Sequence, residues 1–348
     1  MDHSKYYCPA GTAFLILAAA LYICVWSPST SNPFLDNYNQ QNNCHCSNTT
    51  SVKDELELAL SKASMPNKTV IIAVVNKAYV EKTVVEKATM LDLFLESFWL
   101  GEDTRPLLQH LLLVAVDQTA YLRCQFQRLH CYRLVTEGVD FEGEKVFMSD
   151  DFVKMMWRRT LLLLDVLNRG YNFIFTDMDV MWLRNPFMKL SPTESVDMQI
   201  SVDTFNNDPR PEHNFVNTGF YYIRSNNKTI SLLDTWYSQK DHSAGRKEQD
   251  VLQDLMHGGL FQRLNLTVKF LETTHFSGFC QDSQDITAVT TVHANCCRLI
   301  KAKFTDLAAV LRDWKQFKTV VKEHTEVAGK IIGDFKWAPH TECWNSWK

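Results

Sequence analysis

The segment 172–179 (NFIFTDMD) decides the fold and points to the chemistry. Its apolar half leads directly into two carboxylates, Asp177 and Asp179, that one residue separates. In an extended chain, residues i and i+2 point to the same side, so both carboxylates can face one hard divalent cation. D-x-D also occurs by chance on solvated turns, but the apolar residues 180–182 (VMW) that follow argue against such a turn here. The segment predicts a buried strand that ends in a metal site.

Similar apolar runs alternate with helical patterns along the rest of the chain. Strands are expected at 69–75 (TVIIAVV), 111–116 (LLLVAV), 198–202 and 219–223 (GFYYI), and helices at about 84–99, 152–169 and 304–324. This alternation is typical of an α/β domain with a mostly parallel sheet. Ligands of open α/β sheets bind beyond the carboxyl ends of the strands, so polar residues that follow the strands are site candidates.

Composition limits the class of protein. The chain has 348 residues, of which 45% are hydrophobic and 22% charged, as expected for a folded globular body. Its net charge of −4 gives no basic excess for the phosphates of nucleic acid. Nucleic acid is therefore not an expected partner.

The N-terminus carries the most apolar stretch. Residues 10–26 (AGTAFLILAAALYICVW) are uncharged and follow a short head that contains Lys5. This pattern predicts a cytosolic head at 1–9, a transmembrane signal anchor at 10–26 and a lumenal body. A cleaved signal peptide is the alternative, although the small residues Ala18–Ala20 lie inside the apolar run rather than after it.

Between the anchor and the body the chain is polar. Residues 27–46 are rich in Ser, Asn, Gln and Pro, which cannot bury enough apolar surface to fold. A helix is expected within 52–65, where Leu56, Leu60 and Ala63 have helical spacing. We assign 27–66 to a lumenal stem and 67–348 to the folded domain.

Sequons and cysteines agree with a secretory compartment. N-x-[ST] sequons occur at Asn48, Asn67, Asn227 and Asn265, all on the same side of the apolar stretch. Eight cysteines lie beyond the anchor, and an even number in a lumen favours disulfides without fixing their pairing. A zinc site is the alternative for His275, Cys280, His293 and Cys296, but their spacing matches no structural zinc motif.

Other common phosphate and hydrolase motifs are missing from the sequence. It contains neither G-x-x-x-x-G-K-[ST] nor G-x-G-x-x-G after a strand, so a metal is the expected holder of any phosphate. It also lacks H-E-x-x-H and G-x-S-x-G, the local signatures of zinc peptidases and serine hydrolases.

Several runs resemble the plant nucleotide-diphospho-sugar transferases of glycosyltransferase family 77. They are 159–187 (RTLLLLDVLNRGYNFIFTDMDVMWLRNPF), 215–225 (FVNTGFYYIRS), 248–252 (EQDVL), 291–297 (TVHANCC) and the long run 74–105. The resemblance extends from about Leu56 to the C-terminus. It implies a GT-A-type, Rossmann-like mixed sheet flanked by helices, on a type II Golgi membrane anchor.

The resemblance also implies an activity. Members of this family transfer a sugar from a UDP-sugar donor with retention of configuration and usually with Mn²⁺ or Mg²⁺. Their known acceptors are cell-wall pectin and hydroxyproline-rich glycoproteins, and their donors carry xylose, arabinose or galactose. Which sugar and acceptor apply to this chain does not follow from the resemblance.

The family's functional residues map onto this sequence as follows. Asp179 matches the direct metal ligand, Asp177 the carboxylate shared between metal and ribose, and His293 the late histidine of the metal and diphosphate site. Asn76, Lys77 and Asp117 match the uridine side, and Gln249 and Asp250 match a catalytic pair beside the anomeric carbon.

Some of these residues have simpler interpretations. Asp117 is equally expected as a helix N-cap, and Gln249–Asp250 as the start of a surface helix. The small polar segment Asn217–Gly219 precedes an apolar strand. It is expected to form either a turn that lines the sugar or acceptor pocket or an ordinary turn at the start of the strand. A metal-dependent phosphohydrolase and an inactive lumenal carbohydrate-binding protein remain alternative functions.

Overall fold

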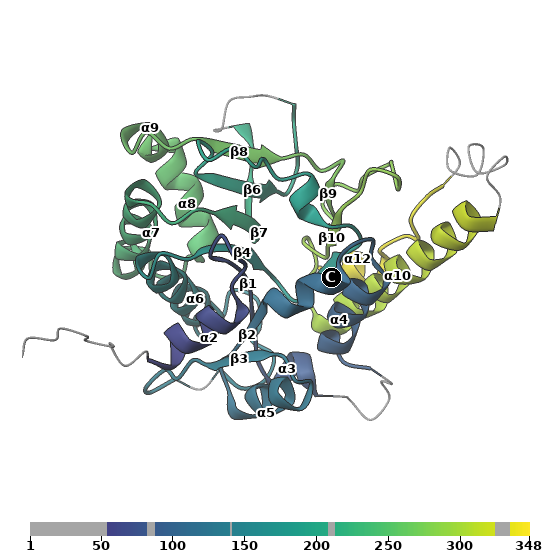
Figure 1. Ribbon diagram of the computed structural model, residues 1–348, viewed down its shortest axis with the longest axis horizontal. Helices are drawn as coiled ribbons and strands as arrows, with labels where there is room; N and C mark the ends of the chain where they lie inside the picture. Colours follow the sequence, from purple (N-terminus) through teal and green to yellow (C-terminus); the bar gives the residue numbers. More distant parts are fainter. Residues whose placement is uncertain (1–53, 82–87, 140, 208–212, 324–334) are drawn as a thin grey trace, which may run out of the picture. The chain divides into compact units, whose positions relative to one another are not determined.

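The computed structural model describes residues 54–81, 88–139, 141–207, 213–323 and 335–348 (Figure 1). The predicted anchor, the stem up to residue 53, the sequon at Asn48, and Cys44 and Cys46 lie outside these ranges. Within the described ranges, no helix combines the length and apolarity that a membrane crossing needs.

A seven-stranded mixed sheet forms the centre of the fold, as predicted. Its strands are β1 (Thr69–Val75), β2 (Leu111–Ala115), β3 (His130–Arg133), β4 (Asn172–Thr176), β6 (Met198–Val202), β7 (Val216–Ile223) and β8 (Val268–Leu271). They lie in the order β3-β2-β1-β4-β7-β6-β8. The four strands from β3 to β4 are parallel, whereas β7 runs antiparallel to both of its neighbours.

A second sheet of three short strands continues from the first. It contains β5 (Val180–Trp182), β10 (Thr291–His293) and β9 (Phe276–Gly278), with β10 in the middle. β10 pairs antiparallel with β5, in a register that sets His293 opposite Val180. Because Val180 directly follows the D-x-D segment, this pairing brings a histidine from far along the chain to the two carboxylates.

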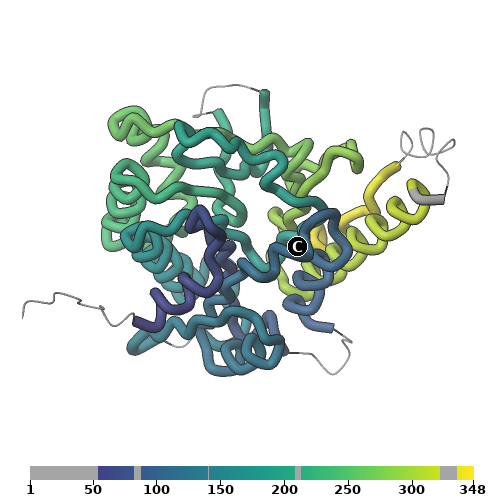
Figure 2. The backbone as a smooth tube through the Cα atoms, in the orientation of Figure 1, coloured from purple at the N-terminus to yellow at the C-terminus, as the bar shows by residue number. Residues whose placement is uncertain are grey.

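Helices cover both faces of the central sheet. They are α2 (Glu55–Ala63), α3 (Lys77–Val80), α4 (Met90–Leu100), α5 (Gln118–Phe126), α6 (Asp150–Asn168), α7 (Asn227–Ser238), α8 (Glu248–His257), α9 (Leu260–Arg263), α10 (Ile300–Glu323) and α12 (Thr341–Asn345). Short 3₁₀ turns occupy Arg105–His110, Pro186–Met188 and Lys240–His242. Figure 2 shows the C-terminal segment, with α12, returning beside α10.

The alternation of β1 divides its side chains between two hydrophobic cores. Val70 and Ile72 pack in the core that includes the buried faces of α2, α6, α7 and α8. Ile71 and Ala73 face the other core, which is built largely from α4, α5 and α10. Period-2 alternation of this kind, with both faces buried, explains why the strand reads as a continuous apolar run.

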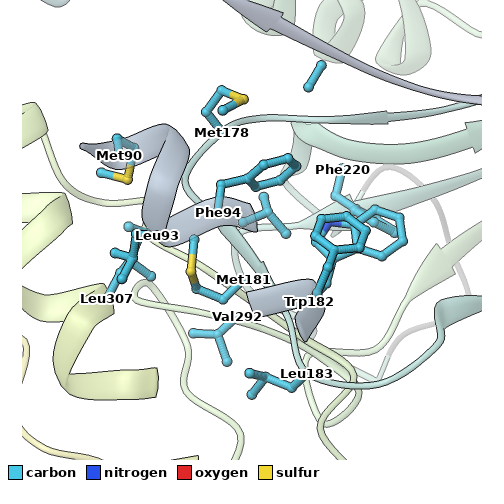
Figure 3. Close-up of a cluster of buried hydrophobic side chains, with 14 of the residues drawn as sticks. Met90, Leu93, Phe94, Met178, Met181, Trp182, Leu183, Phe220, Val292 and Leu307 are labelled. Carbon is cyan, nitrogen blue, oxygen red and sulfur yellow. The ribbon is translucent and has the colours of Figure 1, made fainter. Parts of the chain in front are cut away.

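Trp182 anchors the segment that follows the two carboxylates (Figure 3). Its fully buried ring stacks on Phe98 at 4.7 Å between centroids and meets Phe220 edge-on at 5.7 Å. The indole Nε1 donates to Thr176 Oγ1 at 3.2 Å, and the backbone N–H donates to Ser97 Oγ at 3.0 Å. These contacts hold the chain on both sides of Asp177 and Asp179 in one conformation.

Two boundaries differ from the sequence prediction. Residues 55–63 were assigned to the stem, but α2 buries Leu56, Leu60 and Ala63 in the core, so the folded body begins before residue 67. Strand β7 begins at Val216, so Asn217–Gly219 lie inside a buried strand and not in a turn before it. Local pattern missed this start because Asn217 and Gly219 are of types depleted in strands, a preference that tertiary pairing overrides.

The described cysteines are all paired in three disulfides, Cys124–Cys131, Cys280–Cys296 and Cys297–Cys343. The expectation of disulfides is thereby confirmed for this part of the chain. The zinc alternative was wrong, because Cys280 and Cys296 bond to each other and offer no thiolate to a metal.

A pair of substitutions tests whether α2 belongs to the folded body. Leu60 is fully buried and Leu58 is 45% exposed on the same helix. We expect Leu60→Ala to lower the free energy of unfolding by about 2–5 kcal/mol, because it leaves a cavity. Leu58→Ala should change it by less than about 0.5 kcal/mol. Denaturant titration, monitored by tryptophan fluorescence, measures the free energy of unfolding of both variants. Equal values for the two variants would indicate that α2 belongs to the stem and not to the folded body.

Candidate functional site

A cavity of about 270 Å³ opens where the carboxyl ends of β1 and β4 meet the second sheet. Its lining includes most of the residues predicted from sequence: Asn76, Asp177, Asp179, Asn217, Gly219, Gln249 and His293. This is the edge of the sheet at which open α/β folds bind ligands. The predicted residues Lys77, Asp117 and Asp250 do not line it.

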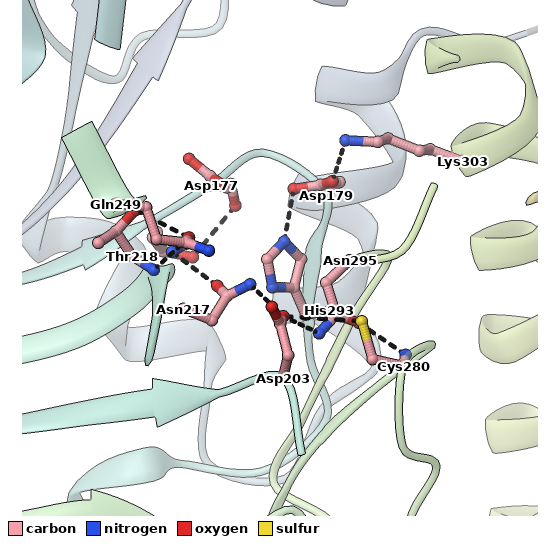
Figure 4. Close-up of polar contacts among 12 residues, drawn as sticks. Asp177, Asp179, Asp203, Asn217, Thr218, Gln249, Cys280, His293, Asn295 and Lys303 are labelled. Atoms are coloured by element: carbon pink, nitrogen blue, oxygen red, sulfur yellow. Dashed lines mark hydrogen bonds and ion pairs between the residues drawn. The ribbon is translucent and has the colours of Figure 1, made fainter. Parts of the chain in front are cut away.

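Asp177, Asp179 and His293 come together in this cavity (Figure 4). One ligand atom from each lies within 4.8 Å of the others, and His293 Nε2 is 3.3 Å from Asp179 Oδ1. The backbone helps, since Ala294 N–H donates to the Asp179 carbonyl at 3.0 Å. Asp179 is 2% exposed and His293 9%, so we call these three residues the floor of the cavity.

Cations balance the two carboxylates of the floor. Lys303 Nζ, from the first turn of α10, lies 2.7 Å from Asp179 Oδ2. Burial raises the pKa of Asp179, but Lys303 and His293 outweigh it and hold that pKa well below its usual range. Burial raises the pKa of Asp177 above its ordinary value despite the nearby Arg159 guanidinium.

The floor fits a hard divalent cation. Two converging carboxylates are the oxygen ligands that Mg²⁺ and Mn²⁺ prefer, and the imidazole offers a third ligand atom. Lys303 already shows that a positive charge is stable beside Asp179.

Gly219 allows the floor to be this compact. A Cβ atom there would come within 2.3 Å of His293 Cε1 and 2.8 Å of Asp177 Oδ2. Both contacts are far shorter than van der Waals distance, so any side chain would push the histidine and the carboxylate apart. Glycine is required at position 219 because β7 approaches these two side chains so closely. The sequence analysis placed Gly219 at the site but could not explain why it is a glycine.

Arg159 and Glu248 are functional residues that sequence reasoning missed. Arg159 on α6 donates to Asp177 Oδ1 at 3.0 Å and to Glu248 Oε1 at 2.5 Å. Both side chains are buried and line the cavity, and Glu248 Oε2 has no hydrogen-bond partner among the residues that the structure describes. The available signal was an arginine on the apolar face of a helix, where a charge must have a buried partner.

Gln249 and Asp250 separate in the structure. Gln249 Oε1 accepts from Thr218 N–H at 3.0 Å, at the cavity wall. The Asp250 carboxylate turns toward Lys247, 3.8 Å away, and its side chain is 41% exposed. Glu248 and Gln249, rather than Gln249 and Asp250, are therefore the polar pair that faces the cavity.

The residues predicted for the uridine side have structural partners. Asp117 caps α5 by accepting from Ala120 N–H at 2.8 Å, which confirms the N-cap interpretation, and it also accepts from Lys77 N–H. Lys77 Nζ lies 3.8 Å from Glu81. Asn76 Nδ2 donates to the Gly143 carbonyl at 2.7 Å, while its buried Oδ1 has no hydrogen-bond partner in the described part of the chain. Of the three, Asn76 alone lines the cavity.

A further carboxylate of the cavity, Asp203, was also missed. Its Oδ1 accepts from Asn217 Nδ2 at 2.8 Å and from Asn295 Nδ2 at 2.9 Å, and all three residues line the cavity (Figure 4). This network joins β7 to the segment after β10 across the wall.

Solved structures with loosely similar folds include glycosyltransferases and a cytidylyltransferase from Leptospira borgpetersenii. Mouse xyloside xylosyltransferase 1 aligns with 66% of this chain and 98% of its own, at 16% identity and a TM-score of 0.37. The galactosyltransferase LgtC aligns with 68% of this chain and 94% of its own, at 14% identity and a TM-score of 0.40. Scores this low carry no argument about function.

Sequence comparison is more informative. An uncharacterized Arabidopsis thaliana protein is 56% identical over 336 residues, 96% of this chain and 92% of that protein. An Arabidopsis thaliana β-arabinofuranosyltransferase is 25% identical over 238 residues, 64% of this chain and 41% of that protein. The family model described as nucleotide-diphospho-sugar transferase matches residues 106–307, a range that contains the whole floor of the cavity. The chain therefore belongs to the nucleotide-diphospho-sugar transferase family.

Proposed function

We propose that this protein is a metal-dependent, retaining glycosyltransferase of GT-A type. It moves a pentose such as xylose or arabinose, or galactose, from a UDP-sugar to a cell-wall polysaccharide or a hydroxyproline-rich glycoprotein. The observation that carries the proposal is the convergence of Asp177, Asp179 and His293 on the floor beside the polar pair Glu248 and Gln249.

The names of relatives support this range of donors. Besides the β-arabinofuranosyltransferase, a Dictyostelium discoideum UDP-galactose:fucoside α-3-galactosyltransferase is 30% identical over 98 residues. An Arabidopsis thaliana UDP-D-xylose:L-fucose α-1,3-D-xylosyltransferase is 28% identical over 120 residues. Each match covers about a third of this chain or less, so it supports the reaction class and leaves the individual sugar open.

The floor residues serve the leaving group. Asp177, Asp179 and His293 would hold Mn²⁺ or Mg²⁺, which when bound stabilises negative charge on the departing diphosphate. Lys303 contributes a second positive charge at the same place, 2.7 Å from Asp179. Because these side chains are fixed before substrate arrives, their reorganisation adds little to the barrier.

Glu248 and Gln249 serve the sugar side. The anomeric centre becomes positively charged as its bond to phosphate breaks, and the buried Glu248 carboxylate, whose Oε2 is unpartnered, can stabilise that charge. Arg159 fixes the direction of this carboxylate by donating to its other oxygen. Gln249 holds Thr218 and lines the wall where the acceptor hydroxyl must approach.

The location we propose is the Golgi membrane, with residues 1–9 cytosolic, 10–26 in the bilayer as a type II anchor and the remainder lumenal. The sequon asparagines Asn67, Asn227 and Asn265 are all exposed, so glycans there would not disturb the core.

Replacement of one floor carboxylate tests the metal site. Asp179→Asn keeps the shape but removes the charge, so we expect transfer to fall at least about 100-fold, or about 2.7 kcal/mol of transition-state stabilisation. Mn²⁺-dependent UDP binding should weaken as well. Asp234→Asn, at an exposed position of α7, is the control and should leave both unchanged. Calorimetric titration with UDP, with and without Mn²⁺, measures this binding. Unaltered Mn²⁺-dependent UDP binding in Asp179→Asn would contradict the proposal that the metal binds at this site.

Neighbouring substitutions on α8 test the sugar side. Gln249→Ala should reduce the transfer rate by at least about 10-fold while sparing UDP binding, since Gln249 faces the cavity. Asp250→Ala should change the rate less than about 3-fold, because its carboxylate points to Lys247. Initial rates of sugar transfer from a panel of UDP-sugars provide the measurement. The reverse ranking would show that Asp250 and not Gln249 meets the substrate.

Topology has its own test. If the body is lumenal, protease added to intact microsomes should spare it, and a deglycosylating enzyme should increase its mobility in a gel. Detergent should then expose the body to the protease. Full digestion in intact vesicles together with no mobility shift would contradict the type II assignment.

A further inference from the structure

A second group of side chains lines the same cavity nearer to solvent. We call Phe147, Lys247, Arg298 and Trp347 the mouth cluster. Phe147 is 37% exposed and Trp347 49%, in contrast to the buried floor. None of the four belongs to the residues assigned above to the metal, the diphosphate or the anomeric centre.

Stacking contacts organise the mouth cluster. The Arg298 guanidinium lies 3.9 Å from the centre of the Trp347 ring and 5.8 Å from that of Phe147. Lys247 Nζ lies 5.5 Å from the centre of the same phenyl ring. Lys247 and Arg298 thus both lie against the Phe147 ring. Each of these cation–π contacts is attractive and removes only part of the water around the cation.

The C-terminal segment is fixed in place to form this cluster. Trp347 Nε1 donates to the Cys296 carbonyl at 2.6 Å, and Arg298 N–H donates to Ser346 Oγ at 3.0 Å. The Cys297–Cys343 disulfide ties the same two stretches covalently. Trp347 is therefore a built part of the cavity wall.

The charges at the mouth are less well balanced than those at the floor. At the floor, Arg159 lies 3.0 Å from the Asp177 carboxylate and Lys303 lies 2.7 Å from that of Asp179. At the mouth, Lys247 meets Asp250 at 3.8 Å, and no carboxylate in the described ranges lies within ion-pair distance of Arg298. A guanidinium stacked on a ring keeps its N–H groups in the plane, where they can bind a carboxylate in bidentate fashion.

We propose that the mouth cluster binds the acceptor, and that this acceptor is a saccharide carrying a carboxylate, that is, a uronic acid. The inference rests on the proposed function: the donor fills the floor first, and the acceptor then enters from solvent past the exposed groups. A half-exposed indole offers an apolar face to a sugar ring, and Arg298 and Lys247 offer charge to its carboxylate. The phosphates of the donor are the other source of an anion, which the experiment separates.

The test measures binding rather than turnover. Full-length protein with Mn²⁺ and UDP is applied to an array of cell-wall oligosaccharides, each printed in its uronic-acid form and with the carboxyl groups reduced to alcohols. We expect the wild type to bind at least one acidic form about 10-fold or more tightly than its reduced partner. Arg298→Gln should cut that ratio below about 3-fold, and Trp347→Leu should weaken binding of both forms.

Controls distinguish an acceptor carboxylate from the donor phosphates as the anion that Arg298 binds. They also distinguish a failure of this inference from a failure of the proposed function. Arg312→Gln removes a cation whose side chain is 67% exposed on α10, outside the cavity lining, and should keep the wild-type ratio. Calorimetric UDP binding should be equal in the wild type and Arg298→Gln. A loss of UDP binding in Arg298→Gln would assign Arg298 to the donor and overturn the inference, as would equal binding of acidic and reduced forms by the wild type. A wild type that binds no UDP with Mn²⁺ would instead refute the proposed function.

Discussion

Two carboxylates one residue apart, Asp179 buried and Asp177 with a side chain that is 35% exposed, determine which charges the surrounding elements must supply. An ionised carboxylate inside a protein is unstable by several kcal/mol unless charges and hydrogen bonds compensate for the lost water. Here the compensation comes from three distant segments: Arg159 on α6, His293 on β10 and Lys303 on α10. The fold must bring these elements to one point, and the pairing of β10 with β5 is the contact that does so most directly.

The same elements explain why the site is rigid. Arg159 links Asp177 to Glu248, so the metal side and the sugar side of the cavity share one buried cation. Trp182, packed between Phe98 and Phe220, fixes the chain just after Asp179. Gly219 lets β7 approach the histidine and the carboxylate closely. A buried network in which each member has a partner holds its geometry better than isolated polar groups would.

Ion pairs stabilise the floor of the cavity, whereas disulfides and stacked side chains stabilise its wall nearer to solvent. The Cys280–Cys296 and Cys297–Cys343 disulfides bracket the wall that follows His293 and attach the C-terminal segment to it. Arg298 rests there on Trp347, where water can reach it. The cavity therefore has a charge-balanced interior and a cationic, aromatic entrance, which are suited to different parts of a reaction between two substrates.

Features that depend on local pattern could be predicted from the amino-acid sequence. Strand β4 has the predicted limits, and the D-x-D that follows it marks the candidate metal site, because an apolar run that ends in two carboxylates is a local signal. The boundary at α2 was misplaced because amphipathic spacing reveals a helix but not the surface that receives its apolar face.

Tertiary structure alone decided which residues meet. No local pattern specifies which cysteines pair, or that Arg159 reaches Asp177 and Glu248, since these contacts join segments distant in the chain. It also decided between Gln249 and Asp250. Successive residues of an α-helix point about 100° apart, so the packing of α8 against β7 turns Glu248 and Gln249 inward and Asp250 away. The orientation of α8 about its axis depends on the neighbouring strand β7. The sequence of α8 alone does not specify where that strand lies.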